Sequence, residues 1–326
     1  MVEVYRTPLT ADLVKDKALE FGADIVGIAD GAAMNENPPD PDDPRRPSDI
    51  TDYDADRVIV IGQRVSLGAT RIQSWSDRHK YVNDELTIAG LEEVALDLVR
   101  WLERNGYPAL IVPPTHVDPW RYDGDPRAHQ KLPLSLDHAA VEAGLGTLGL
   151  NLQLLTPEFG PRVILTAILS SVPVEPDRPM ETPLCLGPEC GRCLSACPGD
   201  AIGHWDRDWI ACDTHRQPHG FKQVTEFLDE VIDETDPEMQ KRMLRNEKSF
   251  YIWASILRGA GAVTGCRRCQ DVCPVGADYE ALLKDALDAI PEDTPDKRAR
   301  LAGLREAEAA GDRGPAWPAQ KRWIGS

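Results

Sequence analysis

The stretch that decides the organisation of this chain lies in its second half, where residues 185–198 read CLGPECGRCLSACP and residues 266–274 read CRRCQDVCP. Both runs end in the spacing C-x2-C-x3-C-P, which is typical of the loops that wrap a [4Fe–4S] cluster in bacterial two-cluster ferredoxins. The chain has eight cysteines, all between Cys185 and Cys273, and Cys212 lies alone between the two runs. Eight is the number that two such clusters need.

In two-cluster ferredoxins the last cysteine of each run binds the other cluster, and this rule divides the eight cysteines into two sets. The first set is Cys185, Cys190, Cys193 and Cys273, and the second set is Cys197, Cys212, Cys266 and Cys269. Zinc sites of four cysteines normally come as separated C-x2-C pairs. The opening C-x4-C-x2-C resembles plant-type [2Fe–2S] spacing, but the second run argues against that cluster. A radical SAM site needs C-x3-C-x2-C, the reverse order.

Composition limits the remaining possibilities. The chain has 326 residues, 42% of them hydrophobic, which suffices for a sizeable core and for two domains. Its 54 acidic and 36 basic side chains give a net charge of −18, which argues against a nucleic-acid partner. No apolar run reaches the ~20 residues of a membrane span. Without a secretory signal at the first residues, we expect a cytoplasmic protein with no membrane partner, whose cysteines bind metal.

The first 180 residues alternate between helical and strand patterns, which predicts a layered α/β domain. Helices are expected over residues 10–21, 84–105 and 135–143, and strands over 23–28, 57–61, 109–112 and 163–174. We therefore predict three parts: a domain over 1–180, a domain with two clusters over 181–285, and a helical tail over 286–326. Trp317 and Trp323 in the tail are expected to anchor it to the surface, with a cap over an active-site mouth as the alternative.

Residues 143–151 form a glycine loop with Gly144, Gly146, Gly149 and Asn151. The pattern G-x-G-x-x-G matches the dinucleotide-binding fingerprint, but that fingerprint needs a strand before it and a helix after it. Here a helix comes before, so a nicotinamide or flavin site is not expected. The glycines instead indicate a sharp turn, or a backbone that lies close to a large flat ligand.

The stretch 143–179, AGLGTLGLNLQLLTPEFGPRVILTAILSSVPVEPDRP, followed by the two cysteine runs, resembles the cobalamin-dependent reductive dehalogenases and their relative epoxyqueuosine reductase. The resemblance implies an α+β fold, in which a nitroreductase-like α/β domain binds base-off cobalamin and the substrate beside a two-cluster ferredoxin-like domain. It places the cobalamin contacts at Gly144, Gly146, Gly149 and Asn151. The D-x-H-x-x-G signature of His-on cobalamin is absent, because Pro218 stands at its glycine position after Asp213-x-His215.

Reductive cleavage needs a proton donor, and the dehalogenases use a tyrosine beside an arginine or lysine. The matching candidates in this chain are Tyr107 and Arg162, and His129 or Gln130 falls where the family often has a polar anchor. Each also has an ordinary explanation. Tyr107 suits a half-buried helix–strand junction, Arg162 a salt bridge at the start of a strand, and His129 a solvated loop.

The expected reaction is two-electron reductive cleavage of a small molecule, most readily dehalogenation, with electrons from an external ferredoxin or flavodoxin. The chain departs from the dehalogenases at Thr147 and Leu150, where they commonly have an acid and then a base. It departs from epoxyqueuosine reductase at Gln130, where that enzyme has an acid. An epoxyqueuosine reductase-like tRNA-modifying enzyme is one alternative. A non-catalytic electron-transfer or cobalamin-carrying protein is the other.

Overall fold

The structure is a computed structural model, and it describes residues 5–115 and 131–325. Its central feature is a four-stranded sheet in the order β1-β2-β6-β3, with every neighbouring pair antiparallel. The strands are β1 (Ile25–Asp30), β2 (Arg57–Arg64), β6 (Val163–Ser170) and β3 (Ala109–Val112). They are rich in β-branched residues, which favour a pleated and buried surface.

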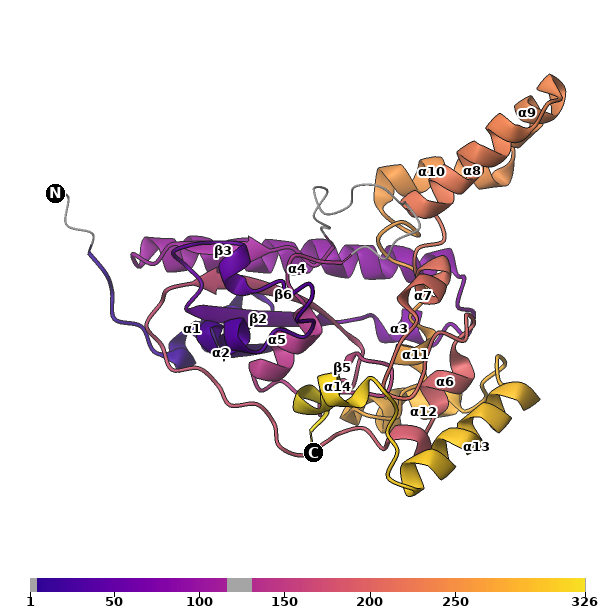
Figure 1. Cartoon of the computed structure of the whole chain (residues 1–326). Helices are drawn as coiled ribbons and strands as arrows, with labels where there is room; N and C mark the ends of the chain where they lie inside the picture. The colour runs from indigo at the N-terminus through magenta and orange to yellow at the C-terminus, as the bar shows by residue number, and fades with distance from the viewer. Residues whose placement is uncertain (1–4, 116–130, 326) are drawn as a thin grey trace.

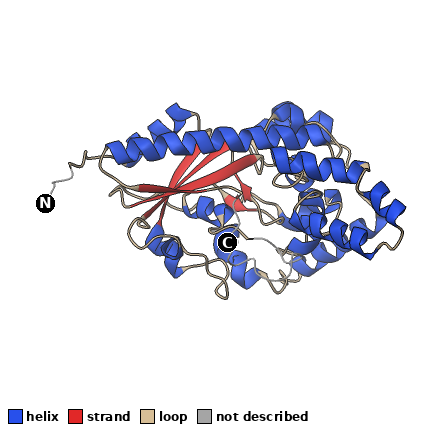
Figure 2. Cartoon of the chain, turned by 90° about the horizontal axis from the view of Figure 1, so that it is seen from above, coloured by secondary structure: helices blue, strands red, loops and turns tan. Residues whose placement is uncertain are grey.

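Helices cover both faces of this sheet (Figure 1). The alternation along β2 shows why: Ile59 and Ile61 pack with α1 (Ala11–Phe21) and α4 (Arg78–Arg104), whereas Val58 and Val60 pack with α2 (Gly31–Glu36) and α5 (Leu136–Glu142). Figure 2 shows the long helix α4 lying across the strands. The predicted mixed helix-and-strand architecture is confirmed, and helix α4 begins before the predicted residue 84 because Asp77 caps it at His79 N–H.

The region over residues 181–285, here the cysteine-bearing region, is built from short helices. The elements from the glycine loop to the end of the chain are β4 (Thr147–Leu148), β5 (Leu154–Leu155), η2 (Gly187–Glu189), α6 (Arg192–Ala196), α7 (Trp209–Arg216), α8 (Phe221–Asp233), α9 (Pro237–Met243), α10 (Glu247–Arg258), α11 (Arg268–Asp271), η3 (Tyr279–Leu283), α12 (Lys284–Leu287), α13 (Pro295–Ala309) and α14 (Trp317–Ile324). The short α3 (Leu67–Thr70) and η1 (Pro47–Asp49) lie earlier in the chain. Helices α8, α9 and α10 form an arm that extends away from the rest (Figure 1).

A buried group of charges joins α4 to the second cysteine run. Lys80 contacts Asp271 at 2.6 Å, and both side chains are fully buried. Arg267 contacts Asp84 at 2.6 Å and also pairs with Asp271. Buried ion pairs of this kind specify one arrangement of packed elements more than they stabilise it. They fix the start of α4 against the loop that carries Cys266 and Cys269.

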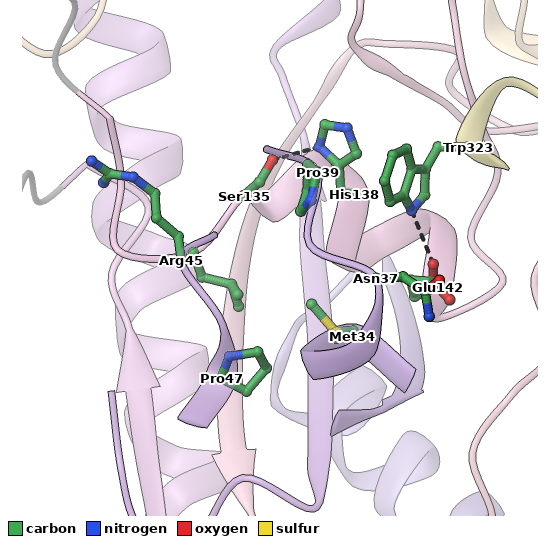
Figure 3. A pocket seen from close by; sticks show the side chains of 10 residues that line it. Met34, Asn37, Pro39, Arg45, Pro47, Ser135, His138, Glu142 and Trp323 are labelled. Carbon is green, nitrogen blue, oxygen red and sulfur yellow. Dashed lines mark hydrogen bonds between the residues drawn. The ribbon is translucent and has the colours of Figure 1, made fainter. Parts of the chain in front are cut away.

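The C-terminal helix α14 packs against α5. Trp323 is buried, and its indole Nε1 donates a hydrogen bond to the Glu142 carboxylate at 2.9 Å (Figure 3). Arg322 contacts the same carboxylate at 2.7 Å. The expectation that the tail is anchored by packing is therefore confirmed. No helix among the described residues is both long and apolar enough to cross a membrane.

His138 lies under this tail, with Ser135 Oγ at 2.6 Å from its Nδ1 (Figure 3). Gln320 Oε1 lies 3.3 Å from its Nε2. Burial lowers the pKa of His138 to about 4. Because the unfolded chain then takes up the proton first, the free energy of unfolding should fall as the pH drops below about 6.5. We expect a loss of about 1 to 2 kcal/mol from this residue between pH 7 and pH 5, measured by urea unfolding. His138→Gln should remove that part of the slope, and an unchanged slope would assign it to other groups.

Candidate functional site

The first set of cysteines surrounds one cavity. Cys185, Cys190, Cys193 and Cys273 all line a space of about 310 Å³, here the first cavity. Backbone N–H groups are directed at one of the sulfurs, because Leu150 N and Gly187 N lie 3.4 and 3.3 Å from Cys185 Sγ. Hydrogen bonds from backbone to sulfur are a feature of iron–sulfur sites. The sequence-distant Cys273 thus lies with the cysteines of the other run.

The second set surrounds a narrower space, here the second cavity. It is lined by Cys197, Cys212, Cys266 and Cys269 together with Arg207 and His215. Ala201 N lies 3.3 Å from Cys197 Sγ, and Arg207 Nη2 donates to Cys212 Sγ at 2.8 Å. The two groups that the crossing rule predicts are therefore the two groups that the fold brings together.

The chemistry of both donor sets fits a cubane, since each offers four thiols at one cavity and N–H donors toward their sulfurs. In the described part of the chain, no three His, Cys, Asp or Glu side chains are close enough to hold a single metal ion. A four-iron cluster takes one thiolate on each iron, so its ligands lie farther apart than those of one ion. Burial raises the pKa of Cys269 to about 11 and that of Cys273 to about 12, so bound iron must supply the charge that keeps them thiolates.

The glycine loop forms the hairpin of β4 and β5 and borders the first cavity. A side chain at Gly146 would lie 1.8 Å from the Leu155 carbonyl oxygen, and one at Gly144, where φ is +74°, would lie 2.6 Å from that of Arg178. These two glycines are thus required by contacts within the protein itself. Gly149 and Asn151 line the first cavity. The loop predicted to contact cobalamin therefore lies beside the first set of cysteines.

A third cavity of about 230 Å³, here the central cavity, lies between the sheet and the cysteine-bearing region. Val163 and Leu165 of β6 form an apolar part of its wall, and Asp84 of α4 and Asp137 of α5 add carboxylates. Cys266, Cys269 and Arg207 line both this cavity and the second cavity. A group bound at the second set would therefore face the central cavity directly.

Asp137 is a candidate acid in this cavity that the sequence did not single out. One of its carboxylate oxygens accepts the Leu154 N–H at 2.7 Å, and no described Lys or Arg lies within ion-pair distance of it. Burial raises the pKa of this carboxyl, against the opposing effects of the Leu154 hydrogen bond and of Arg207 and Arg216. The sequence shows no sign of this role. Asp137 follows the helix cap Ser135 by two residues, and an acid in the first turn of a helix is common.

The predicted pair of Tyr107 and Arg162 is not brought together, which corrects the expectation that they act side by side. Ala109, just after Tyr107, pairs with Ser170 at one end of β6, whereas Arg162 precedes Val163 at the other end. Seven residue steps along a strand correspond to roughly 23 Å. Tyr107 is buried, and its hydroxyl donates to the Thr7 carbonyl at 3.0 Å. His129, the third candidate, lies outside the described residues.

Arg162 is fully buried and holds the loop that follows the second cysteine run. It contacts both carboxylate oxygens of Asp278, at 2.9 and 2.5 Å, and donates to the carbonyls of Cys273 at 2.8 Å and Val275 at 2.7 Å. Its guanidinium is thus directed at protein groups, and it lines neither the first nor the central cavity.

Arg162→Met should lower the free energy of unfolding by about 3–5 kcal/mol, because it leaves the Asp278 carboxylate buried without its partner. Anaerobic urea unfolding measures this loss. The double variant Arg162→Met with Asp278→Leu is the matched control and should recover much of it, since both charges are then removed. A loss below about 1 kcal/mol in the single variant would contradict this structural role.

Comparison with known proteins gives partial matches. A scan against protein-family models finds none that matches. The epoxyqueuosine reductase of Listeria monocytogenes is 28% identical over 154 residues, which are 47% of this chain and 32% of that protein. The tetrachloroethene reductive dehalogenase of Sulfurospirillum multivorans is 38% identical over 81 residues, 24% of this chain and 16% of that protein. The chain thus spans about a third or less of these curated relatives.

Among solved structures, the catabolic reductive dehalogenase NpRdhA shares the fold over 99% of this chain and 39% of its own, with a TM-score of 0.53 and 18% identity. An epoxyqueuosine reductase bound to a modified tRNA stem loop has a TM-score of 0.44, with 19% identity, over 89% of this chain and 69% of its own. At 18% identity, the likeness to NpRdhA shows that this chain has the same fold as that reductive dehalogenase. The chain is similar in sequence to epoxyqueuosine reductases and a reductive dehalogenase, and these named homologues are oxidoreductases.

Proposed function

We propose that this protein is a cytoplasmic reductase with two [4Fe–4S] clusters and cobalamin, which cleaves a bond of a small molecule by two-electron reduction. The main support for the proposal is that Cys266, Cys269 and Arg207 line both the second cavity and the central cavity. In this proposal residues 1–180 form a nitroreductase-like domain for cobalamin and substrate, 181–285 a ferredoxin-like domain, and 286–326 the helical tail.

Electrons would enter at the first set, from an external ferredoxin or flavodoxin. Leu186, which lines the first cavity, is 72% exposed, so a docked donor can come close to that set. The second set, at the wall of the central cavity, would then pass electrons to whatever is bound there. In this order electrons pass from the exposed side of the first cavity to the wall of the central cavity.

The central cavity combines apolar side chains of β6 with charged groups and the Gln153 and Gln270 amides. This mixture suits an apolar corrin ring with polar amides at its edge. Bound cobalamin would supply low-valent cobalt as the reductant. The predicted cobalamin contacts Gly144, Gly146, Gly149 and Asn151 do not line this cavity, and Gly149 and Asn151 line the first cavity instead. Their part in cobalamin binding stays a prediction, tested by the effect of their substitution on cobalamin affinity.

Dehalogenation is the reaction type we favour. It converts a carbon–halogen bond, two electrons and one proton into a carbon–hydrogen bond and a halide ion. The reductive dehalogenase that shares this fold is associated with B12-dependent dehalogenation and has been solved with 3-bromo-4-hydroxybenzoic acid. In this proposal Asp137, which lines the central cavity, would supply the proton.

Anaerobic reconstitution tests this function. The protein should bind about eight irons and one cobalamin, followed by absorption and EPR spectra, and should release bromide from 3-bromo-4-hydroxybenzoic acid or from another haloaromatic in a panel. Eight irons without bound cobalamin would favour an electron-transfer protein. Bound cobalamin without halide release would favour a cobalamin carrier or a different reductive cleavage.

Epoxyqueuosine reduction is the second candidate, because the curated match that covers 47% of this chain has that name. It brings a nucleic-acid partner into consideration, contrary to the expectation from charge. The net charge of −18 and Gln130 in place of an acid speak against it. The same reconstituted protein should therefore also be given an epoxyqueuosine-modified tRNA stem loop, with queuosine formation as the readout.

A further inference from the structure

Arg207 is a buried cation that donates a hydrogen bond to a cysteine sulfur. Its Nη2 donates to Cys212 Sγ at 2.8 Å, and its Nη1 donates to the Asn151 carbonyl at 3.0 Å. The guanidinium carbon lies 4.6 Å from the ring centroid of Trp209, which covers one face. The residue is 8% exposed. These contacts hold the charge in one position, since a guanidinium offers its donors in a fixed plane.

The same guanidinium has a donor left over. Arg207 Nε is buried and has no hydrogen-bond partner among the described residues. Because Arg207 lines the second cavity together with the four cysteines of the second set, a cluster bound there can accept this N–H. A buried donor without a partner is costly, so its presence at this place points to an acceptor that belongs in the cavity.

The first set has a different environment. Its Cys185 sulfur receives only neutral backbone N–H groups, from Leu150 and Gly187. The buried Arg162 donates to the Cys273 carbonyl and not to its sulfur, and it is already paired with Asp278. Among the residues described, the bond from a guanidinium to a sulfur therefore distinguishes the second set from the first.

We propose that Arg207 holds the reduction potential of the second cluster above that of the first, and so directs electrons toward the central cavity. The proposal rests on the two clusters of the proposed function. In the step, one electron leaves the reduced first cluster and enters the oxidised second cluster, and no bond forms or breaks. A reduced ferredoxin or flavodoxin supplies the electron. Reduction adds a negative charge beside a fixed positive one, which stabilises the reduced form in a poorly hydrated site.

The test is an EPR-monitored redox titration of the anaerobically reconstituted protein without cobalamin or substrate. In Arg207→Gln, the ratio of reduced to oxidised second cluster at a fixed potential should fall at least tenfold, which is a shift of 59 mV for a one-electron couple. The first cluster should titrate as in the parent protein. Arg216→Gln is the matched control: this arginine also lines the central cavity but pairs with Asp213, and its loss should leave both potentials near their parent values.

An unchanged second-cluster potential in Arg207→Gln overturns the proposal, as does an equal shift in Arg216→Gln. If Arg207→Gln does not assemble the second cluster, Arg207→Lys decides. Lysine keeps a positive charge but is more strongly hydrated and lacks the planar guanidinium, so the potential of the second cluster should stay near the parent value or fall by less than 59 mV. A fall of 59 mV or more with the charge retained overturns the proposal. Failure of the parent protein to bind about eight irons would instead count against the proposed function.

Discussion

Replacing Cys273 with alanine is expected to remove the first cluster and spare the second, although Cys273 belongs to the second cysteine run. The reason is its position on the first cavity, with Cys185, Cys190 and Cys193. The iron content should fall from about eight to about four per chain, and reductive turnover should be lost because the entry point for electrons is gone. Iron analysis with EPR of the remaining cluster measures the effect.

Cys269→Ala is the matched variant, because it comes from the same run but lies on the second cavity. It should lose the other cluster, so the two variants should retain clusters with different EPR signals and potentials. If both variants kept the same cluster, the crossed assignment would be wrong and each run would bind its own cluster. Loss of both clusters in both variants would mean that neither cluster assembles alone.

Asp137→Asn is expected to lower kcat by about 100- to 10,000-fold while iron and cobalamin binding are retained, because the amide cannot deliver a proton. Since burial raises the pKa of Asp137, the carboxyl keeps its proton to a higher pH than usual. An acid donor must be protonated, so the turnover of the parent protein should fall as the pH rises through that pKa. The variant should lack this dependence, which a pH profile of kcat reveals.

Tyr107→Phe is the control for this prediction. It removes only the hydrogen bond to the Thr7 carbonyl, worth about 1 kcal/mol of stability, and should leave turnover near that of the parent protein. The opposite pattern, with turnover lost in Tyr107→Phe and kept in Asp137→Asn, would return the proton-donor role to Tyr107.

The cysteine groups could be predicted from the sequence because both runs have the spacing of two-cluster ferredoxins, in which the last cysteine of each run binds the other cluster. The layers of the N-terminal part could be predicted because the continuous apolar run of β2 is typical of a strand that is buried on both faces, as β2 is. The separation of Tyr107 and Arg162 could not. It depends on the register in which β6 pairs with β3, and no local pattern encodes that pairing. The buried position of Arg207 beside the second set could not be predicted either, because an arginine in a loop is normally solvated.

If the second set binds a cluster as proposed, the buried charges between α4 and the second cysteine run link the folding of this protein to the supply of iron. These pairs, among Lys80, Asp84, Arg267 and Asp271, form only when the loop bearing Cys266 and Cys269 is in place. In the proposed function, a bound cluster would organise that loop. In a chain made under iron starvation, these four charged side chains would be exposed to water, and the start of α4 would lack its contacts with the second cysteine run. Its survival in the cell would then depend on how soon iron arrives.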